Sequence, residues 1–194
     1  MKHYLTLLFT LFSVYLYSQP NSIDNSFNIG NGFATDNYVD KILVLDNNKI
    51  LVKGNFTSFN SSTVSSNILV LNPSGSLSYS ISSDLTSFNK FIQQPDGKLI
   101  ICGSGTNPVR RYQGSNFNTI DNTFNYSSNL PIFDSELQTD GKLLILQKSV
   151  STSVTRSLRR LNSNGTIDTS FPLINEIKGF RLLSDGKILA IHQN

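Results

Sequence analysis

The sequence predicts an all-β fold in which one small sheet is repeated along the chain. Four turns are each followed by a lysine and a short run of aliphatic residues, and these lysines lie 49, 44 and 45 residues apart. They are Lys49, Lys98, Lys142 and Lys187. Serine, threonine, asparagine and glycine fill the sequence between them, without the 3.6-residue apolar stripe of a helical repeat. A repeat of this length and composition is typical of the four-stranded blades of a β-propeller.

The first hairpin of each repeat unit closes at the turn ahead of the lysine. In "QQPDGKLIICG" we expect Asp96-Gly97 to form a two-residue type I′ turn, because glycine tolerates the positive φ that this turn requires. The Asp-Gly turn positions are Asp96, Gly97, Asp140, Gly141, Asp185 and Gly186. The first unit has Asn47-Asn48 in their place.

A second hairpin follows in each complete unit, with its turn around Pro73-Ser74-Gly75, Gln113-Gly114 or Asn164-Gly165. The predicted strands are 39–45, 49–55, 67–71 and 76–81 in the first unit, 90–94, 98–103, 109–112 and 117–124 in the second, 134–138, 142–147, 154–161 and 166–171 in the third, and 177–183 and 187–192 in the fourth.

The units do not add up to a closed ring. A predicted strand at 23–27 repeats the end of a unit, and the fourth unit stops after two strands. We interpret the array as an incomplete propeller of about three complete units plus partial ones, a fragment or a truncated product of a larger propeller. Its open blade edges and apolar sheet faces would allow self-association.

The N-terminus predicts export. Lys2 precedes an apolar run over residues 4–17, which as a helix would span about 21 Å, short of the roughly 30 Å of a bilayer core. We therefore predict a signal peptide at 1–18, cleaved near Ser18-Gln19, and a repeat region at 19–194 without a membrane span. The net charge is +3 and the few adjacent basic residues do not cluster, so nucleic-acid binding is not expected.

Several stretches resemble a known repeat. "IDNSFNIGNGF", "ILVLDNNKILVKGNFTSFN", "QQPDGKLIICG" and "RRLNSNGTIDTSF" are similar to the delta-60 repeat, a β-propeller-like repeat of secreted bacterial proteins. The resemblance covers essentially all of the chain after the signal peptide and implies a secreted or surface protein of the Bacteroidetes type. It implies no substrate, cofactor or catalytic residue. Ser78 departs from the repeat, since the other units have Asp24, Asp121 or Asp168 at this position.

The residues offer little catalytic chemistry, and we predict no catalytic residue, cofactor or metal site. His192 would be the single histidine and Cys102 is the single cysteine of residues 19–194, too few for a zinc site. The aliphatic surroundings of Cys102 predict a buried, unreactive thiol. The repeated turn aspartates have a sufficient role within their turns. For Asp24, Asp121 and Asp168 we expect a structural role in joining one blade to the next.

These observations favour a secreted or cell-surface repeat module that binds a protein or a glycan and has no catalytic activity. One alternative is a fragment of a propeller-scaffold enzyme acting on a polysaccharide, which should place two carboxylates about 5 to 10 Å apart in a pocket. Another is a structural spacer in a surface protein. The candidate ligand-contact residues are the loop-side aromatics Tyr38, Phe59, Tyr79, Phe117 and Tyr126.

Overall fold

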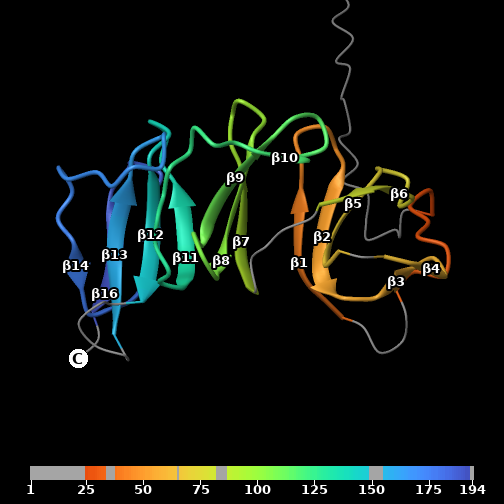
Figure 1. The fold of residues 1–194 in the computed structure, drawn as a ribbon, viewed down its shortest axis with the longest axis horizontal. Coiled ribbons are helices and arrows are strands. Elements are labelled where there is room, and N and C mark those ends of the chain that lie inside the picture. Colours follow the sequence, from red (N-terminus) through yellow and green to blue (C-terminus); the bar gives the residue numbers. More distant parts are fainter. Residues whose placement is uncertain (1–24, 34–37, 65, 82–86, 149–154, 193–194) are drawn as a thin grey trace, which may run out of the picture.

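The computed structural model describes residues 25–33, 38–64, 66–81, 87–148 and 155–192 (Figure 1). All regular elements in these ranges are β-strands, so the prediction of an all-β fold is confirmed. No helix in the described part of the chain is long and apolar enough to cross a membrane. The proposed signal peptide at 1–18 and Asp24 lie outside the described residues.

The described strands form three antiparallel four-stranded sheets and two two-stranded sheets. We call the four-stranded sheets blades 1 to 3 in chain order, and the two-stranded sheet that follows them blade 4. Blade 1 contains β1 (Tyr38–Val44), β2 (Ile50–Asn55), β5 (Ile68–Leu71) and β6 (Leu77–Ser80). Blade 2 contains β7 (Ser87–Gln93), β8 (Leu99–Ser104), β9 (Val109–Gln113) and β10 (Thr119–Ile120). Blade 3 contains β11 (Ile132–Leu137), β12 (Leu143–Lys148), β13 (Arg156–Leu161) and β14 (Ile174–Asn175). Blade 4 is the hairpin of β15 (Ile177–Leu182) and β16 (Ile188–His192), and a small hairpin of β3 (Ser58–Phe59) and β4 (Ser62–Thr63) adjoins blade 1.

The outer strands are shorter than predicted. β10 has two residues where the sequence predicted 117–124, and the predicted strand at 166–171 is reduced to a single bridge between Leu161 and Ile167. In both blades an aspartate ends the pairing, because its side chain accepts the amide N–H of the residue two positions later, Thr123 or Ser170. Of the predicted strand at 23–27, residues 23 and 24 lie outside the described residues, residues 25 and 26 form a turn, and Phe27 has no regular structure.

A β-bulge occurs at the same place in the first strand of every blade. The register shifts between Val39 and Lys41, and again at the equivalent position of β7, β11 and β15. The residues skipped in the pairing are Asp40, Asn89, Phe133 and Lys178, each nine positions before the lysine that follows the turn. The repeat therefore fixes the irregularities of the sheet as well as its regular pairs.

The first turn of each blade is not the predicted type I′ turn. Gln94 donates its N–H to the Lys98 carbonyl at 2.8 Å, and Gly97 donates its N–H to the Gln94 carbonyl at 2.8 Å. These bonds enclose a type I turn followed by Gly97 at φ 81°, a three-residue loop. Pro95 favours this geometry because its ring fixes φ near about −65°, the value that the first central position of a type I turn requires.

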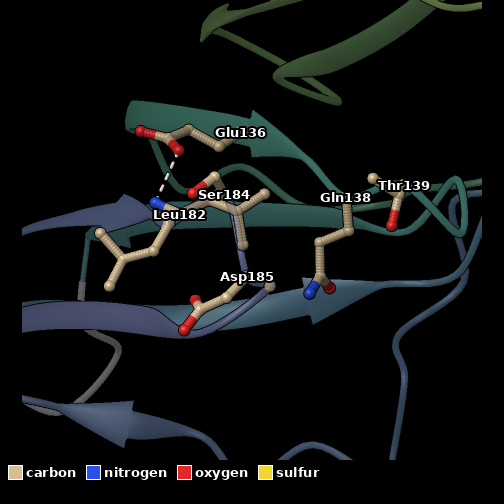
Figure 2. Close-up of a pocket in the computed structure, with 8 residues that line it drawn as sticks. Glu136, Gln138, Thr139, Leu182, Ser184 and Asp185 are labelled. Carbon is tan, nitrogen blue, oxygen red and sulfur yellow. Dashed lines mark hydrogen bonds between the residues drawn. The ribbon is translucent and has the colours of Figure 1, made fainter.

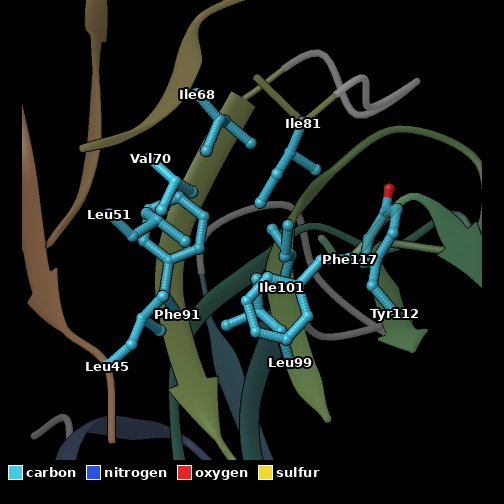
Figure 3. Close-up of a cluster of buried hydrophobic side chains, with 10 residues drawn as sticks. All are labelled: Leu45, Leu51, Ile68, Val70, Ile81, Phe91, Leu99, Ile101, Tyr112 and Phe117. Carbon is cyan, nitrogen blue, oxygen red and sulfur yellow. The ribbon is translucent and has the colours of Figure 1, made fainter. Parts of the chain in front are cut away.

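The core lies between blades, at surfaces that we call junctions. The forward face of a blade packs on the next blade and its back face on the preceding one. At the junction of blades 1 and 2, Leu51 and Val70 of the forward face meet Leu99, Ile101 and Tyr112 of the next back face (Figure 3). Similar apolar clusters fill the junctions of blades 2 and 3 and of blades 3 and 4. Neighbouring blades are thus held by burial of aliphatic side chains from alternate positions of the same strands.

Candidate functional site

Blade 2 contains a buried charged cluster at the end where its turns lie. Asp121 is 2% exposed. Its Oδ2 accepts a hydrogen bond from Arg111 Nε at 2.9 Å and lies 3.1 Å from Lys98 Nζ. Its Oδ1 accepts the N–H of Thr123 at 3.0 Å and the Thr123 hydroxyl at 2.6 Å. Both carboxylate oxygens are therefore occupied within the blade.

Blade 3 repeats this cluster at the equivalent positions, with Ser170 in place of Thr123. Asp168 Oδ2 accepts hydrogen bonds from Arg160 Nε at 2.8 Å and Lys142 Nζ at 2.9 Å, and Oδ1 is bound by Ser170. In blade 1 the arginine and the aspartate of this cluster are both replaced. Val70 and Ser78 stand at the positions of the arginine and the aspartate, and Lys49 Nζ donates to Ser78 Oγ at 3.0 Å. Such paired replacement is expected of a structural ion pair.

The two aspartates are held as carboxylates. Burial alone would raise the pKa of Asp121, but the hydrogen bonds from Thr123 and Lys98 and the charge of Arg111 outweigh it and hold the pKa well below its usual range. The bonds from Ser170 and Lys142 lower the pKa of Asp168 in the same way. Neither group can serve as a general acid near neutral pH.

These aspartates do not themselves join the blades, contrary to expectation. All partners of Asp121 belong to blade 2, and it is Arg111 that crosses the junction, donating from Nη1 to the Ser163 carbonyl of blade 3 at 2.8 Å. The aspartate is too short to cross, whereas the longer arginine reaches the second turn of blade 3. The N–H of Asn125 also donates across the junction, to the Asn164 carbonyl at 2.7 Å.

A second charged group links the first strands of blades 2, 3 and 4. Asp134 lies 3.2 Å from Lys90 Nζ and 3.0 Å from Arg181 Nη1. The same Arg181 nitrogen lies 3.1 Å from Glu136 Oε1, and Glu136 Oε2 accepts the N–H of Leu182 at 2.7 Å. Both acids are paired with the guanidinium, so neither is a free carboxylate of the kind that the enzyme alternative requires.

Two cavities lie at equivalent places in successive junctions. One of about 440 Å³ lies between blades 2 and 3 and is lined by Gln94, Asp96, Arg111 and Asn164. The other, of about 620 Å³, lies between blades 3 and 4. Its walls include Glu136, Gln138, Thr139 and Asp185 (Figure 2). Because the first turn of a blade borders each cavity, the repeat itself builds the site.

Each cavity has an unpaired amide oxygen. Gln94 is 6% exposed, and its Oε1 is buried without a hydrogen-bond partner. Gln138 stands at the same position of blade 3, and its Oε1 is also buried and unpaired. In blade 1 this position is Leu45, a buried core residue. At two of the junctions a glutamine therefore replaces an apolar core residue. The sequence did not predict this role, although both glutamines stand four residues before the lysine.

The Asp-Gly turns use their own carboxylates. Asp96, Asp140 and Asp185 each accept the N–H of the lysine two positions later through Oδ1. The glycines Gly97, Gly141 and Gly186 have φ values of 81°, 81° and 82°. Lys187 lowers the pKa of Asp185 through a side-chain hydrogen bond, so this cavity-lining group is also ionised.

The five candidate contact aromatics do not gather on the surface. Phe59, Phe117 and Tyr126 are buried in three different apolar clusters. Tyr79 packs against the cluster between blades 1 and 2, and Tyr38 is 59% exposed on β1. Buried rings cannot contact a ligand at the surface. The aromatics were expected on the loop side, but Phe117 and Tyr126 lie in the junctions between blades, and Phe59 packs with Phe33 on the back face of blade 1. Cys102 is fully buried, as expected.

In the described ranges, no group of three or more histidine, cysteine or acidic residues is placed to bind a metal ion. His192 is exposed and paired with Ile177 at the end of blade 4.

A comparison with protein families supports a propeller-type repeat. Residues 138–171 match a family model described as "Domain of unknown function (DUF5122) beta-propeller". The matched stretch begins at Gln138 of the cavity and contains the whole Lys142, Arg160 and Asp168 cluster of blade 3. No curated protein matches the chain. The family match thus supports the architecture and is silent about a ligand.

Proposed function

We propose that this chain is a secreted or cell-surface propeller module that binds a glycan or a protein segment in the cavities between its blades, and that it has no catalytic activity of its own. The observation that carries the proposal is the pair of unpaired amide oxygens on Gln94 and Gln138. A buried acceptor without a partner costs about 1–3 kcal/mol. A ligand that donates an O–H or N–H to it recovers that free energy.

The polar groups in the cavity walls indicate which chemical class of ligand can bind. Each cavity has acceptor oxygens in its wall: an amide oxygen and the Asp96 carboxylate, beside the Arg111 guanidinium, in one, and an amide oxygen with the Glu136 and Asp185 carboxylates in the other. A ligand rich in hydrogen-bond donors fits both, as the hydroxyls of a glycan or the N–H groups of a protein segment do. Two equivalent cavities at successive junctions suit a ligand that is itself repetitive, because binding at both sites increases the apparent affinity.

The carboxylates favour binding over catalysis. Asp134 and Glu136 are neutralised by Arg181, and Asp185 is bound by Lys187. A polysaccharide hydrolase needs one protonated and one free carboxylate on either side of the scissile bond. The enzyme alternative therefore has no specific observation in its favour.

An array of soluble polysaccharides and peptides tests the proposal. We expect at least one to bind, and Gln94→Leu with Gln138→Leu to weaken that binding about tenfold or more, since each loses roughly 1–3 kcal/mol of hydrogen bonding. Asn129→Leu, at an exposed position in the link between blades 2 and 3, is the matched control and should leave affinity unchanged. Binding that is equal in all variants would contradict the site. Release of new reducing ends from a bound polysaccharide, abolished by Glu136→Gln, would support the enzyme alternative instead.

A further inference from the structure

The forward face of blade 4 exposes residues that are core residues elsewhere. Leu189 is 56% exposed and Ile191 is 59% exposed. Their equivalents in blade 3, counted from the lysine after the turn, are Leu144 at 0% and Leu146 at 1%. In blade 2 the equivalent positions are likewise buried. Each of the four blades thus has an apolar forward face, and the next blade covers this face in blades 1, 2 and 3 but not in blade 4.

What covers this face inside the chain is known from the junction of blades 3 and 4. Leu144 and Leu146 belong to one cluster with Phe180 and, at its border, Leu182. Both covering residues lie on the back face of β15, the first strand of the following blade. The natural partner of Leu189 and Ile191 is therefore the back face of another first strand.

An open back face of this kind exists on blade 1. Ile42 is 65% exposed and Val44 is 64% exposed on β1. Counted from Lys49, they are the equivalents of Phe180 and Leu182, the residues that cover blade 3.

The rest of the back face of blade 1 is already covered. Val52 and Leu69 pack beneath Phe33, Phe56 and Phe59. The open strip is thus confined to the first strand. A second copy can therefore cover that strip while the segment that covers the remainder stays in place.

We infer that two copies of this chain join head to tail, with Leu189 and Ile191 of one copy packed on Ile42 and Val44 of the next. The two faces do not meet within one chain, because all four residues are exposed and blades 2 and 3 lie between them (Figure 1). The contact would continue the stacking that joins blades 1 to 4. Because the two surfaces differ, each copy keeps one free end, and further copies can add until the series closes or continues as a filament. This inference is independent of the ligand proposed above.

The test uses two blocked variants of the full chain, Leu189→Asp and Ile42→Asp, in sedimentation velocity over a range of protein concentrations. We expect the wild type to associate and each variant alone to be a monomer. An equal mixture should give a dimer and nothing larger, because the intact blade 1 of the first variant meets the intact blade 4 of the second. Ile120→Asp, an equally apolar residue that is 40% exposed on β10, is the control and should associate like the wild type.

Each other outcome overturns the inference. A monomeric wild type at all concentrations would show that no second copy covers these faces. Association that survives both substitutions, as association through the apolar residues 4–17 would, shows a different surface. Variants that stay monomeric when mixed while their circular dichroism and thermal midpoints match the wild type would show that the two faces are not partners.

Discussion

Arg111 and Ser163 connect two blades through one hydrogen bond, from the guanidinium Nη1 to the carbonyl oxygen 2.8 Å away. The guanidinium is held in place from behind by Asp121, whose carboxylate accepts its Nε–H at 2.9 Å. Its cation also lies over the ring of Phe124, 4.8 Å from the centroid. An ion pair inside one blade therefore positions the side chain that joins it to the next.

The first prediction concerns the coupling of Arg111 and Asp121. Asp121→Ser alone leaves a buried guanidinium without its counter-ion and should lower the free energy of unfolding by about 3–5 kcal/mol. The double variant Arg111→Val with Asp121→Ser reproduces Val70 and Ser78 of blade 1 and should lose less than the sum of the two single changes. Urea denaturation of all four proteins measures the coupling. Strictly additive losses would contradict the structural role of the pair.

The second prediction is a loss of stability in acid that depends on this pair. The pKa of Asp121 is lower in the folded protein than in the unfolded chain, where it is about 4. Below that value the unfolded state binds more protons than the folded state, so stability falls as the pH falls. The stabilisation is complete above about pH 5 and is lost progressively below it. The double variant lacks one such carboxylate, so its thermal midpoint should fall less steeply between pH 5 and pH 3, whereas equal slopes would exclude Asp121 as a contributor.

The repeat made the blades predictable from sequence, because the spacing of the lysines fixes the register of the two strands on either side of each turn. The charged link from Lys90 through Asp134 to Arg181 was not predictable. Lys90 and Asp134 are equivalent positions of different charge, and Arg181 stands two residues further along its strand, so the repeat contains no signal for their contact. Such pairs appear only when the blades are stacked.

The burial of the loop-side aromatics could not be predicted from the sequence for a related reason. Phe117 lies in a second turn that is longer than the others, and its backbone φ of 48° directs the chain so that the ring enters the junction with blade 1. The sequence pattern of one sheet predicts which residues share a face, but it does not predict which face a neighbouring blade covers. Gln94 and Gln138 were not predicted because their side chains are polar at a position where Leu45 is apolar. Only the stacked structure shows that Leu45 and Gln94 are buried and that Gln138, although partly exposed, has a buried Oε1.

The third prediction separates backbone strain from contact at the junction of blades 2 and 3. Gly165 has φ 83°, and a Cβ there would lie 2.8 Å from the Asn125 nitrogen and 2.9 Å from the Phe124 ring. Gly97 has nearly the same φ, 81°, but a Cβ there would meet nothing within 4 Å. Gly97→Ala should therefore lose about 1–2 kcal/mol for the left-handed backbone alone.

Gly165→Ala adds the clash with blade 2 to the same strain, so we expect it to lose about 2 kcal/mol more. Urea denaturation of the two variants compares them directly. Equal losses would mean that the junction relaxes around the added methyl group, and that the contact between Phe124 and Gly165 contributes little to holding the blades together.

The fourth prediction uses Cys102 as a reporter of the same junction. The thiol is fully buried in the cluster between blades 2 and 3, and Ser135 donates its hydroxyl to the sulfur at 3.3 Å. Burial raises the pKa of Cys102 to about 12. At pH 8 roughly one molecule in ten thousand then has a thiolate, the form that reacts with disulfide reagents. The folded protein should therefore resist Ellman's reagent, and the unfolded protein should react at once.

Labelling of Cys102 becomes informative when it is combined with the glycine variants. Reaction requires blades 2 and 3 to separate, because the thiol is covered from the side of blade 3. Gly165→Ala weakens that junction and should speed labelling. Gly97→Ala strains the backbone at a position where an added Cβ meets nothing within 4 Å, so it should change the rate little, apart from any global unfolding measured in parallel. If both variants speed labelling in proportion to their loss of global stability, Cys102 becomes accessible only on complete unfolding, and the blades of this chain come apart as one cooperative unit.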